Sequence, residues 1–203
     1  GFQLCTHAIG DRGNKMVLDV YSKAISTSKN HRWRIEHAQM VSNEDIPRFF
    51  KNGIIPSMQP SHCTSDMRWM DDRIGKERFN RISRWKTFID SGCKIPGGSD
   101  CPIEEGNPLF EYYAAITRKN HEGYPENGWE SQECVSRLDA LKMFTTWAAH
   151  AEFSEHRRGK IRPGFDADLT LLSNDLIKCN EEEILKIKVL GTMVAGEFVY
   201  LNF

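Results

Sequence analysis

Short apolar segments alternate with helical segments over the first hundred residues, and this alternation restricts the fold more than any other feature. Strand-like segments cover residues 2–6, 32–36, 54–59 and 93–99. Helices are expected over residues 11–26, about 44–51 and 77–91. Strands joined by helices through short connections are typical of a parallel sheet wound in the right-handed sense. The alternation therefore predicts an α/β fold.

The remaining segments follow a different pattern. Residues 61–76 are polar and predict irregular structure, whereas helices are expected over residues 108–117 and 136–151. Three short strands and one small helix near the carboxyl terminus indicate a separate β-layer. They cover residues 168–172, 181–186 (the helix), 189–194 and 198–201. We therefore expect two domains, over residues 1–158 and 159–203.

The composition excludes several classes of protein. With a net charge of -1 over 203 residues, the chain has no overall basic field for nucleic acid or an anionic membrane. No apolar run approaches the roughly 20 residues that span a bilayer. The six cysteines include no C-x-x-C pair, which indicates reduced thiols and a cytoplasmic location. Because the chain opens directly on a strand at Gly1, we expect a piece of a longer protein.

Three potential metal ligands stand at or just after strand-like segments. His7 and His37 follow the first two segments, and Asp100 follows the fourth after Gly98-Ser99. Taken singly, His7 fits a turn histidine, and Gly-Ser-Asp is an ordinary turn sequence. Parallel strands, however, bring their carboxyl ends to one face, and imidazole and carboxylate are ligands of Zn²⁺. Together the three residues favour a divalent-metal site. His62, just past the third segment, is open to two interpretations, substrate binding or packing in a loop.

Several motifs in a fixed order carry a family resemblance over essentially the full length. They are THAIGDR at 6–12, RIEHAQ at 34–39, QPSH at 59–62, GSDCPIE at 98–104, AAITR at 114–118 and GKIRPGFDADL at 159–169. The set resembles the YtcJ-like metal-dependent amidohydrolases, a branch of the amidohydrolase superfamily that includes N-substituted formamide deformylases. Any one motif alone is unspecific.

The resemblance implies a TIM-like (β/α)₈ barrel with a small β-sandwich domain. This chain would supply barrel strands five to eight and the last strands of the sandwich. His7 would be the metal ligand after strand five, His37 the ligand after strand six, and Asp100 both ligand and proton shuttle. One or two divalent metals, with Zn²⁺ expected, would activate water to hydrolyse a small amide-like C–N substrate near His62.

The sequence also departs from the family pattern. The His-x-His pair after strand one and the ligand after strand four are absent, so at most a partial metal shell is expected. The chain alone should then show little activity, and the alternative is a non-catalytic half-barrel that acts as a folding or interaction module.

A half-barrel would also expose strand edges and an apolar inner face, which predicts a symmetric homodimer. The alternative is that helices or the last strands cover that face from within the chain. The residues expected on the face or edges are Leu4, Ile35, Ile55, Met58 and Ile95.

Overall fold

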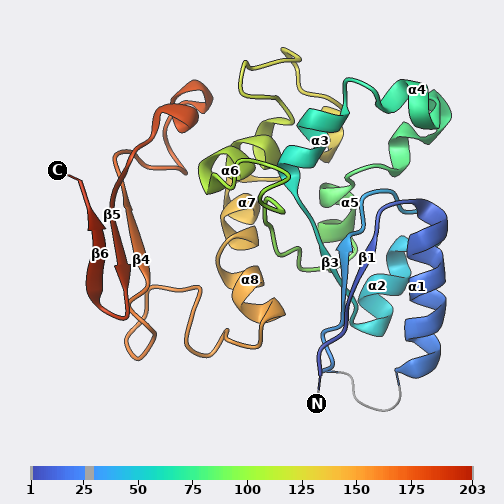
Figure 1. Ribbon diagram of the computed structural model, residues 1–203, viewed down its shortest axis with the longest axis horizontal. Coiled ribbons are helices and arrows are strands. Elements are labelled where there is room, and N and C mark those ends of the chain that lie inside the picture. The colour runs from blue at the N-terminus through green and yellow to red at the C-terminus, as the bar shows by residue number, and fades with distance from the viewer. Residues whose placement is uncertain (1, 26–29, 203) are drawn as a thin grey trace.

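Three parallel strands connected by helices form the amino-terminal part of the molecule (Figure 1). The computed structural model describes residues 2–25 and 30–202. The strand order is β1-β2-β3, which confirms the α/β alternation predicted for this part of the chain. The predicted end of the first helix at Ser26 lies outside the described residues. The bounds are β1 Cys5–Ala8, α1 Asp11–Ala24, β2 Arg34–His37, α2 Ile46–Asn52 and β3 Ile55–Ser57.

The register of the sheet places the ends of β1 and β2 side by side. His7 is paired with Glu36, and Ala8 with His37. Helix α1 covers the sheet because Leu18 and Tyr21, one turn apart, both point into the core. Burying each such side chain contributes roughly 1.5–3 kcal/mol. The carboxyl ends of the strands therefore form one rigid edge above a packed interior.

The fourth predicted strand, residues 93–99, is wrong. The segment makes only an isolated parallel bridge between Met58 and Gly97. Pro96 has no N–H to donate to a ladder, although its carbonyl oxygen accepts from Met58 N at 3.1 Å. On the other side, Gly97 N donates to the carbonyl oxygen of Met143, which lies in a helix, at 3.0 Å. The segment is thus extended and held on both sides without forming a strand.

The prediction of irregular structure over residues 61–76 is also wrong, because two short helices occupy it, α3 Pro60–Asp66 and α4 Met70–Ile74. Pro60 stands at the favoured first helical position. The face that α3 buries includes Ser61 and Thr64, small polar residues that give no apolar periodicity. The amphipathic signal is therefore missing although the helix is packed.

Two long predicted helices are each divided. Residues 77–91 form the 3₁₀ helix η1 Lys76–Arg81 and the helix α5 Trp85–Asp90. Between them Ser83 has a φ of 48°, and its N–H donates to Gln39 O at 2.7 Å, which draws the chain out of helical geometry.

The helix predicted over 136–151 breaks between α7 Arg137–Met143 and α8 Thr146–Ala151. The carbonyl oxygen of Met143, which would accept a bond from the next helical turn, instead accepts from Gly97. Helix α6 Pro108–Thr117 is found where it was predicted, and a short 3₁₀ helix, η2 Ser131–Glu133, follows it.

The carboxyl-terminal strands form a separate antiparallel sheet of order β4-β5-β6 (Figure 1). They are β4 Leu169–Leu172, β5 Val189–Val194 and β6 Glu197–Leu201, with η3 Glu181–Lys186 between the first two. The predicted strands are confirmed. Ile184 of η3 belongs to the same core cluster as Tyr112 of α6. The division at residues 158 and 159 stays a prediction. None of the helices in the described residues has the length and apolar character that crossing a membrane requires.

The apolar sheet residues expected to be exposed are mostly covered. Ile35, Ile55, Met58 and Ile95 are all buried within the single chain, and only Leu4, at 44% exposure, is open. That expectation is wrong for four of the five because helices of the same chain pack over the sheet. The argument for a homodimer from an exposed inner face loses its basis, and the oligomeric state stays a prediction.

Candidate active site

Two histidines meet at the carboxyl edge of the parallel sheet. His7 lies in β1 and His37 ends β2, and their ring centroids are 4.5 Å apart in an edge-on arrangement. His37 and Ala38 both have positive φ, 73° and 42°. Such backbone costs about 1–3 kcal/mol per residue and clusters at functional sites. The edge where the two rings meet is therefore a candidate functional site.

Asp100 and His62 join this pair from elements further along the chain. The Asp100 Oδ2 atom is 3.9 Å from His37 Nε2, and Asp100 itself has a φ of 56°. The ring of His62, from α3, is nearly parallel to that of His37, with 5.7 Å between centroids. The structure therefore brings together all four residues that the sequence singled out. The distance between His37 and Asp100 is too long for a direct hydrogen bond.

The environment of His37 favours its neutral form. Burial lowers the pKa of His37, and the neighbouring His7 lowers it further, whereas Asp100 opposes the shift. A neutral imidazole has a free lone pair, which is the form that binds a metal or accepts a hydrogen bond. The contact between His37 and Asp100 is accordingly not an ion pair at neutral pH.

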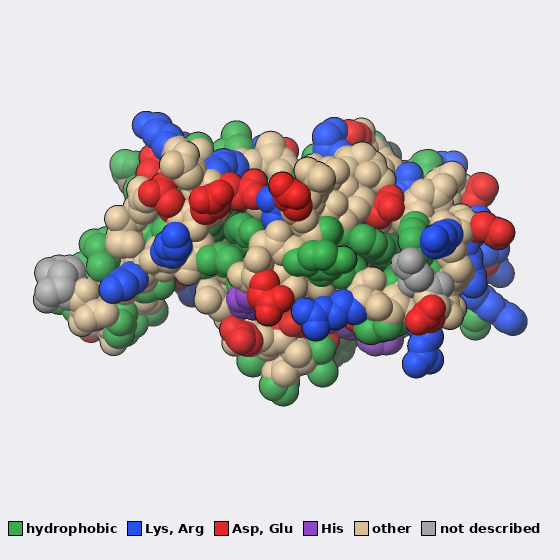
Figure 2. Space-filling model, turned by 90° about the horizontal axis from the view of Figure 1, so that it is seen from above, with side chains coloured by type: hydrophobic (Ala, Val, Ile, Leu, Met, Phe, Trp, Pro, Cys, Tyr) green, Lys and Arg blue, Asp and Glu red, His purple; other side chains and the backbone are tan. Residues whose placement is uncertain are grey.

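The four residues line one cavity of about 810 Å³. Its other polar side chains include Gln39 and Asp66, which are joined by a 2.6 Å bond from Gln39 Nε2 to Asp66 Oδ2. Burial raises the pKa of Asp66. The apolar wall is made by Ile9, Met40, Trp69, Met70, Ile74, Ile82 and Ile103. Figure 2 looks onto the molecule from above and shows hydrophobic side chains set among acidic and basic ones. The cavity thus combines an apolar wall with a polar side that holds the histidines and carboxylates.

The two parallel rings also line a second, much smaller cavity of about 10 Å³. His37, His62, Gln39, Gln59 and Ser83 supply its polar lining. Among the described residues, His37 Nδ1 and His62 Nε2 are buried without a hydrogen-bond partner. Each ring thus has one buried nitrogen that no protein group in the described part of the chain satisfies.

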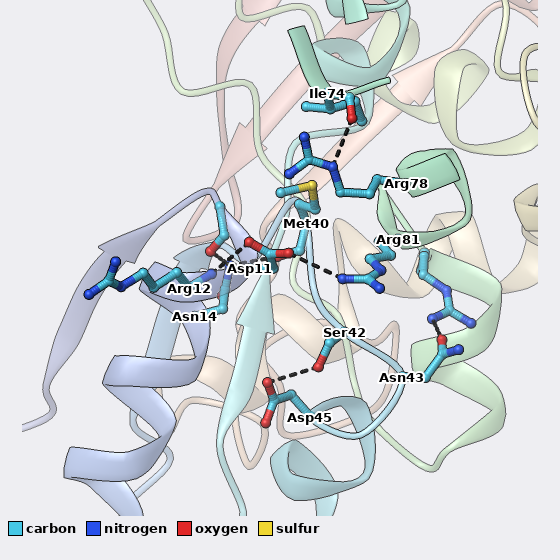
Figure 3. A network of polar contacts seen from close by, with 12 residues as sticks. Asp11, Arg12, Asn14, Met40, Ser42, Asn43, Asp45, Ile74, Arg78 and Arg81 are labelled. Carbon is cyan, nitrogen blue, oxygen red and sulfur yellow. Dashed lines mark hydrogen bonds and ion pairs between the residues drawn. The ribbon is translucent and has the colours of Figure 1, made fainter. Parts of the chain in front are cut away.

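Asn14 of α1 ties together the loops that follow β1 and β2 (Figure 3). Its Nδ2 atom lies 3.0 to 3.2 Å from four backbone carbonyl oxygens, those of Ala8, Ile9, Gly10 and Met40. Asn14 is fully buried, so these contacts are shielded from water. The residue fixes the spacing of the two loops that follow His7 and His37, and sequence reasoning missed it because its partners are all backbone atoms.

An ion pair on the protein surface also connects these loops to a neighbouring helix. Asp11, at the start of α1, accepts a bond from Arg81 Nη1 at 3.3 Å (Figure 3). This contact links the loop after β1 to η1, whose carboxyl end bridges to Met40 through Ile82. Both side chains are partly exposed, so the pair stabilises the fold by at most about 1 kcal/mol.

The donor set fits a divalent metal in kind but is loosely gathered. Two imidazoles and a carboxylate are typical ligands of Zn²⁺ and similar ions, and the Nε2 atom of His37 faces Asp100. Within residues 2–25 and 30–202, however, no three potential ligands stand close enough together to hold a metal ion. Residues His7, His37 and Asp100 could supply ligands if they closed on the ion.

Comparison with known protein sequences relates this chain to amidohydrolases. The sequence matches the family model described as "Amidohydrolase family" over residues 1–200. It is 35% identical over 202 residues to the putative amidohydrolase YtcJ of Bacillus subtilis (strain 168) and 32% over 203 residues to the protein LONG AFTER FAR-RED 3 of Arabidopsis thaliana. An N-substituted formamide deformylase of Arthrobacter pascens is 27% identical over 203 residues. Each alignment covers 98% of this chain but only 34% to 38% of the relative.

Solved structures of metal-dependent hydrolases are also similar to this chain. An uncharacterized metal-dependent hydrolase from Pyrococcus furiosus is similar with a TM-score of 0.73 and 30% identity, covering 88% of this chain and 35% of that one. A counterpart from Pyrococcus horikoshii OT3 has a TM-score of 0.76 and 28% identity, covering 89% and 36%. A mutant of the atrazine chlorohydrolase TrzN from Arthrobacter aurescens TC1, solved with zinc and atraton, has a TM-score of 0.66. At 18% identity, over 98% of this chain and 44% of that one, it supports the fold alone.

Proposed function

Since the chain belongs to the amidohydrolase family, we propose that it forms the carboxyl-terminal part of a metal-dependent hydrolase that cleaves amide-like C–N bonds in small molecules. In this proposal β1 to β3 and the extended segment around Gly97 correspond to barrel strands five to eight. The strands β4 to β6 correspond to the last strands of a sandwich. The gathering of His7, His37, His62 and Asp100 on one cavity is the observation that carries the proposal.

We assign the metal to His7, His37 and Asp100. Zn²⁺ is our choice of ion, because imidazole nitrogen and carboxylate oxygen suit it and His37 is held neutral. A divalent ion held there supplies Lewis-acid polarisation of a carbonyl group and acidification of water. The six cysteines are all free thiols in the structure, which is in keeping with a reducing, cytoplasmic location.

The remaining steps belong to the side chains. Asp100, whose side chain is 43% exposed at the cavity, accepts the proton of the attacking water at Oδ2 and returns it to the leaving nitrogen. His62 binds the substrate, and the apolar wall that includes Trp69 holds the substituent that does not react. The second half of the metal shell, the His-x-His pair of the family, is absent from these 203 residues. We therefore expect little turnover by this chain alone.

Zinc titration followed by calorimetry tests the metal assignment. We expect binding to the 203-residue chain that is lost or weakened at least tenfold in His7→Ala, His37→Ala and Asp100→Ala. His156→Ala is the matched control, because His156 is exposed and lies outside the cavity lining. Equal binding by all five proteins, or none by the parent chain, would overturn the assignment. The second result would favour the non-catalytic folding or interaction module.

A further inference from the structure

We propose that Glu111 of α6 is a positioning residue for His62: its carboxyl group fixes the first turn of α3 and thereby holds the His62 ring against His37. The inference rests on the proposed function only in the role of His62, which is substrate binding. The geometry itself is independent of metal and substrate.

The contact replaces the cap that α3 lacks. Pro60 at the start of the helix has no N–H, and Gln59 before it makes no side-chain cap. The next residue, Ser61, donates its backbone N–H to Glu111 Oε2 at 2.9 Å. Its hydroxyl donates to the other carboxyl oxygen, Oε1. Both oxygens of one carboxyl group are thus engaged by a single residue, which fixes the position of Ser61 and the direction of its backbone.

Ser61 immediately precedes His62, so fixing one places the other. His62 Nε2 is buried and has no partner among the described residues, so no protein hydrogen bond at this atom orients the ring. Its position is set by the backbone of α3 and by the parallel packing on His37. Glu111, which lies 50 positions away from Ser61 in the sequence, therefore controls the position of the His62 side chain.

Glu111 is suited to this task because it is rigidly held. It is 2% exposed, and α6 on either side of it is packed into the main core through Phe110 and Tyr112. Helix α6 also begins with its own cap, in which Asn107 Oδ1 accepts from Leu109 N at 3.0 Å. The carboxyl group is presented from a fixed element and transmits that rigidity to α3.

The chain contains a matched control for this arrangement. Glu133 accepts a bond from Thr87 N at 2.9 Å and another from the Thr87 hydroxyl, at the first turns of α5. The geometry repeats that of Glu111 and Ser61, but α5 supplies only Trp85 to the small cavity and nothing to the large one. Removing this second carboxyl group disturbs a helix start without touching His62.

Aromatic NMR spectra of the histidines test the proposal without metal or substrate. His62 is assigned with His62→Asn, and the contact between its ring protons and those of His37 is followed by the nuclear Overhauser effect. We expect Glu111→Ala to abolish that effect and to move the His62 signals by more than those of His31, a histidine outside both cavities. Glu133→Ala is expected to leave both unchanged.

Conservative variants keep the test decisive if Glu111→Ala does not fold. Glu111→Gln retains one acceptor for Ser61 N and is expected to keep the effect, whereas Ser61→Ala removes the hydroxyl bond and is expected to weaken it. The proposal is overturned if the His62 signals and the ring contact persist in folded Glu111→Ala, or in Ser61→Ala where only that variant folds. It is also overturned if Glu133→Ala moves them equally. Failure of zinc binding would leave these results untouched, so the two proposals fail separately.

Discussion

The buried carboxyl group of Glu111 gives the stability of the protein a specific dependence on pH. Burial raises the pKa of Glu111 from its ordinary 4.5 to about 7, against the bonds from Ser61, which lower it. At about 1.4 kcal/mol per pH unit, this difference corresponds to about 3 kcal/mol of folding free energy. For a residue that is 2% exposed, solvent screening takes little from this value.

The sign follows from proton binding. Between pH 4.5 and 7 the folded chain keeps the proton on Glu111, whereas the unfolded chain has released it. The free energy of unfolding therefore falls as the pH rises through this window. The contribution is fully present below pH 4.5 and lost above pH 7.

The matched variant is Glu111→Gln, which has the shape of the protonated acid and does not titrate. Urea unfolding of both proteins at several pH values between 4.5 and 8 gives the difference in unfolding free energy, in which other titrating groups cancel. We expect the two proteins to be similar near pH 4.5. At pH 8 the variant should be more stable by about 3 kcal/mol. Glu133→Gln should keep the parent's slope, because Glu111 is intact in it.

Two outcomes would refute the reasoning. A difference that is constant with pH would mean that Glu111 ionises equally in the folded and unfolded chains. A parent protein that gains stability over Glu111→Gln as the pH rises would mean that the two bonds from Ser61 outweigh the burial of the charge.

Four further substitutions test the geometry elsewhere. Gly128→Ala should lower the unfolding free energy by more than about 3 kcal/mol, because its Cβ would lie 2.2 Å from the carbonyl oxygen that ends α6. Gly164 also has a positive φ but lies in open space, so Gly164→Ala should lower the unfolding free energy by only about 1–2 kcal/mol. Equal urea midpoints for the two glycine variants would contradict this. Asn14→Ala should cost about 2 kcal/mol and shift the amide signals of residues 37–40, and an unchanged spectrum would count against its role. The Arg32 guanidinium lowers the pKa of Glu155 to about 2. Glu155→Gln should therefore lower the unfolding free energy by up to about 1 kcal/mol at pH 7, and by less as the pH falls toward 2. A loss of stability that does not change with pH would rule this out.

Local sequence signals were sufficient for the elements that depend on local contacts. The three parallel strands and the three carboxyl-terminal strands are short apolar runs bounded by turn residues, and the sequence predicts all six. The first differs in its bounds, because β1 spans Cys5–Ala8 and includes His7 whereas residues 2–6 were expected. The approach of His7 to His37 follows from strand order, because parallel strands end on one face. Asp100 lines the same cavity, although the strand predicted before it does not form and its Oδ2 atom lies 3.9 Å from His37 Nε2. Their roles as ligands remain a prediction.

The errors arose where distant contacts decide the backbone. The helix predicted over 77–91 is broken because Ser83 bonds to Gln39, and the helix over 136–151 because Met143 bonds to Gly97. The helix α3 was missed because its buried face includes the polar residues Ser61 and Thr64 and its cap, Glu111, lies 50 positions away. Periodicity within one segment contains no information about such partners.

Contacts between residues that are distant in the sequence also keep the candidate site rigid. Three polar side chains around it are nearly inaccessible to water, Asn14 and Arg118 at 0% and Glu111 at 2%. Arg118 lies over the Trp85 ring and donates to Ser83 O at 2.8 Å, beside the break between η1 and α5. Leaving a buried polar group unpaired costs about 1–3 kcal/mol, whereas apolar contacts can repack at smaller cost. Directional bonds of this kind penalise each alternative position of the loops, so the histidines are held in place by the folded chain itself.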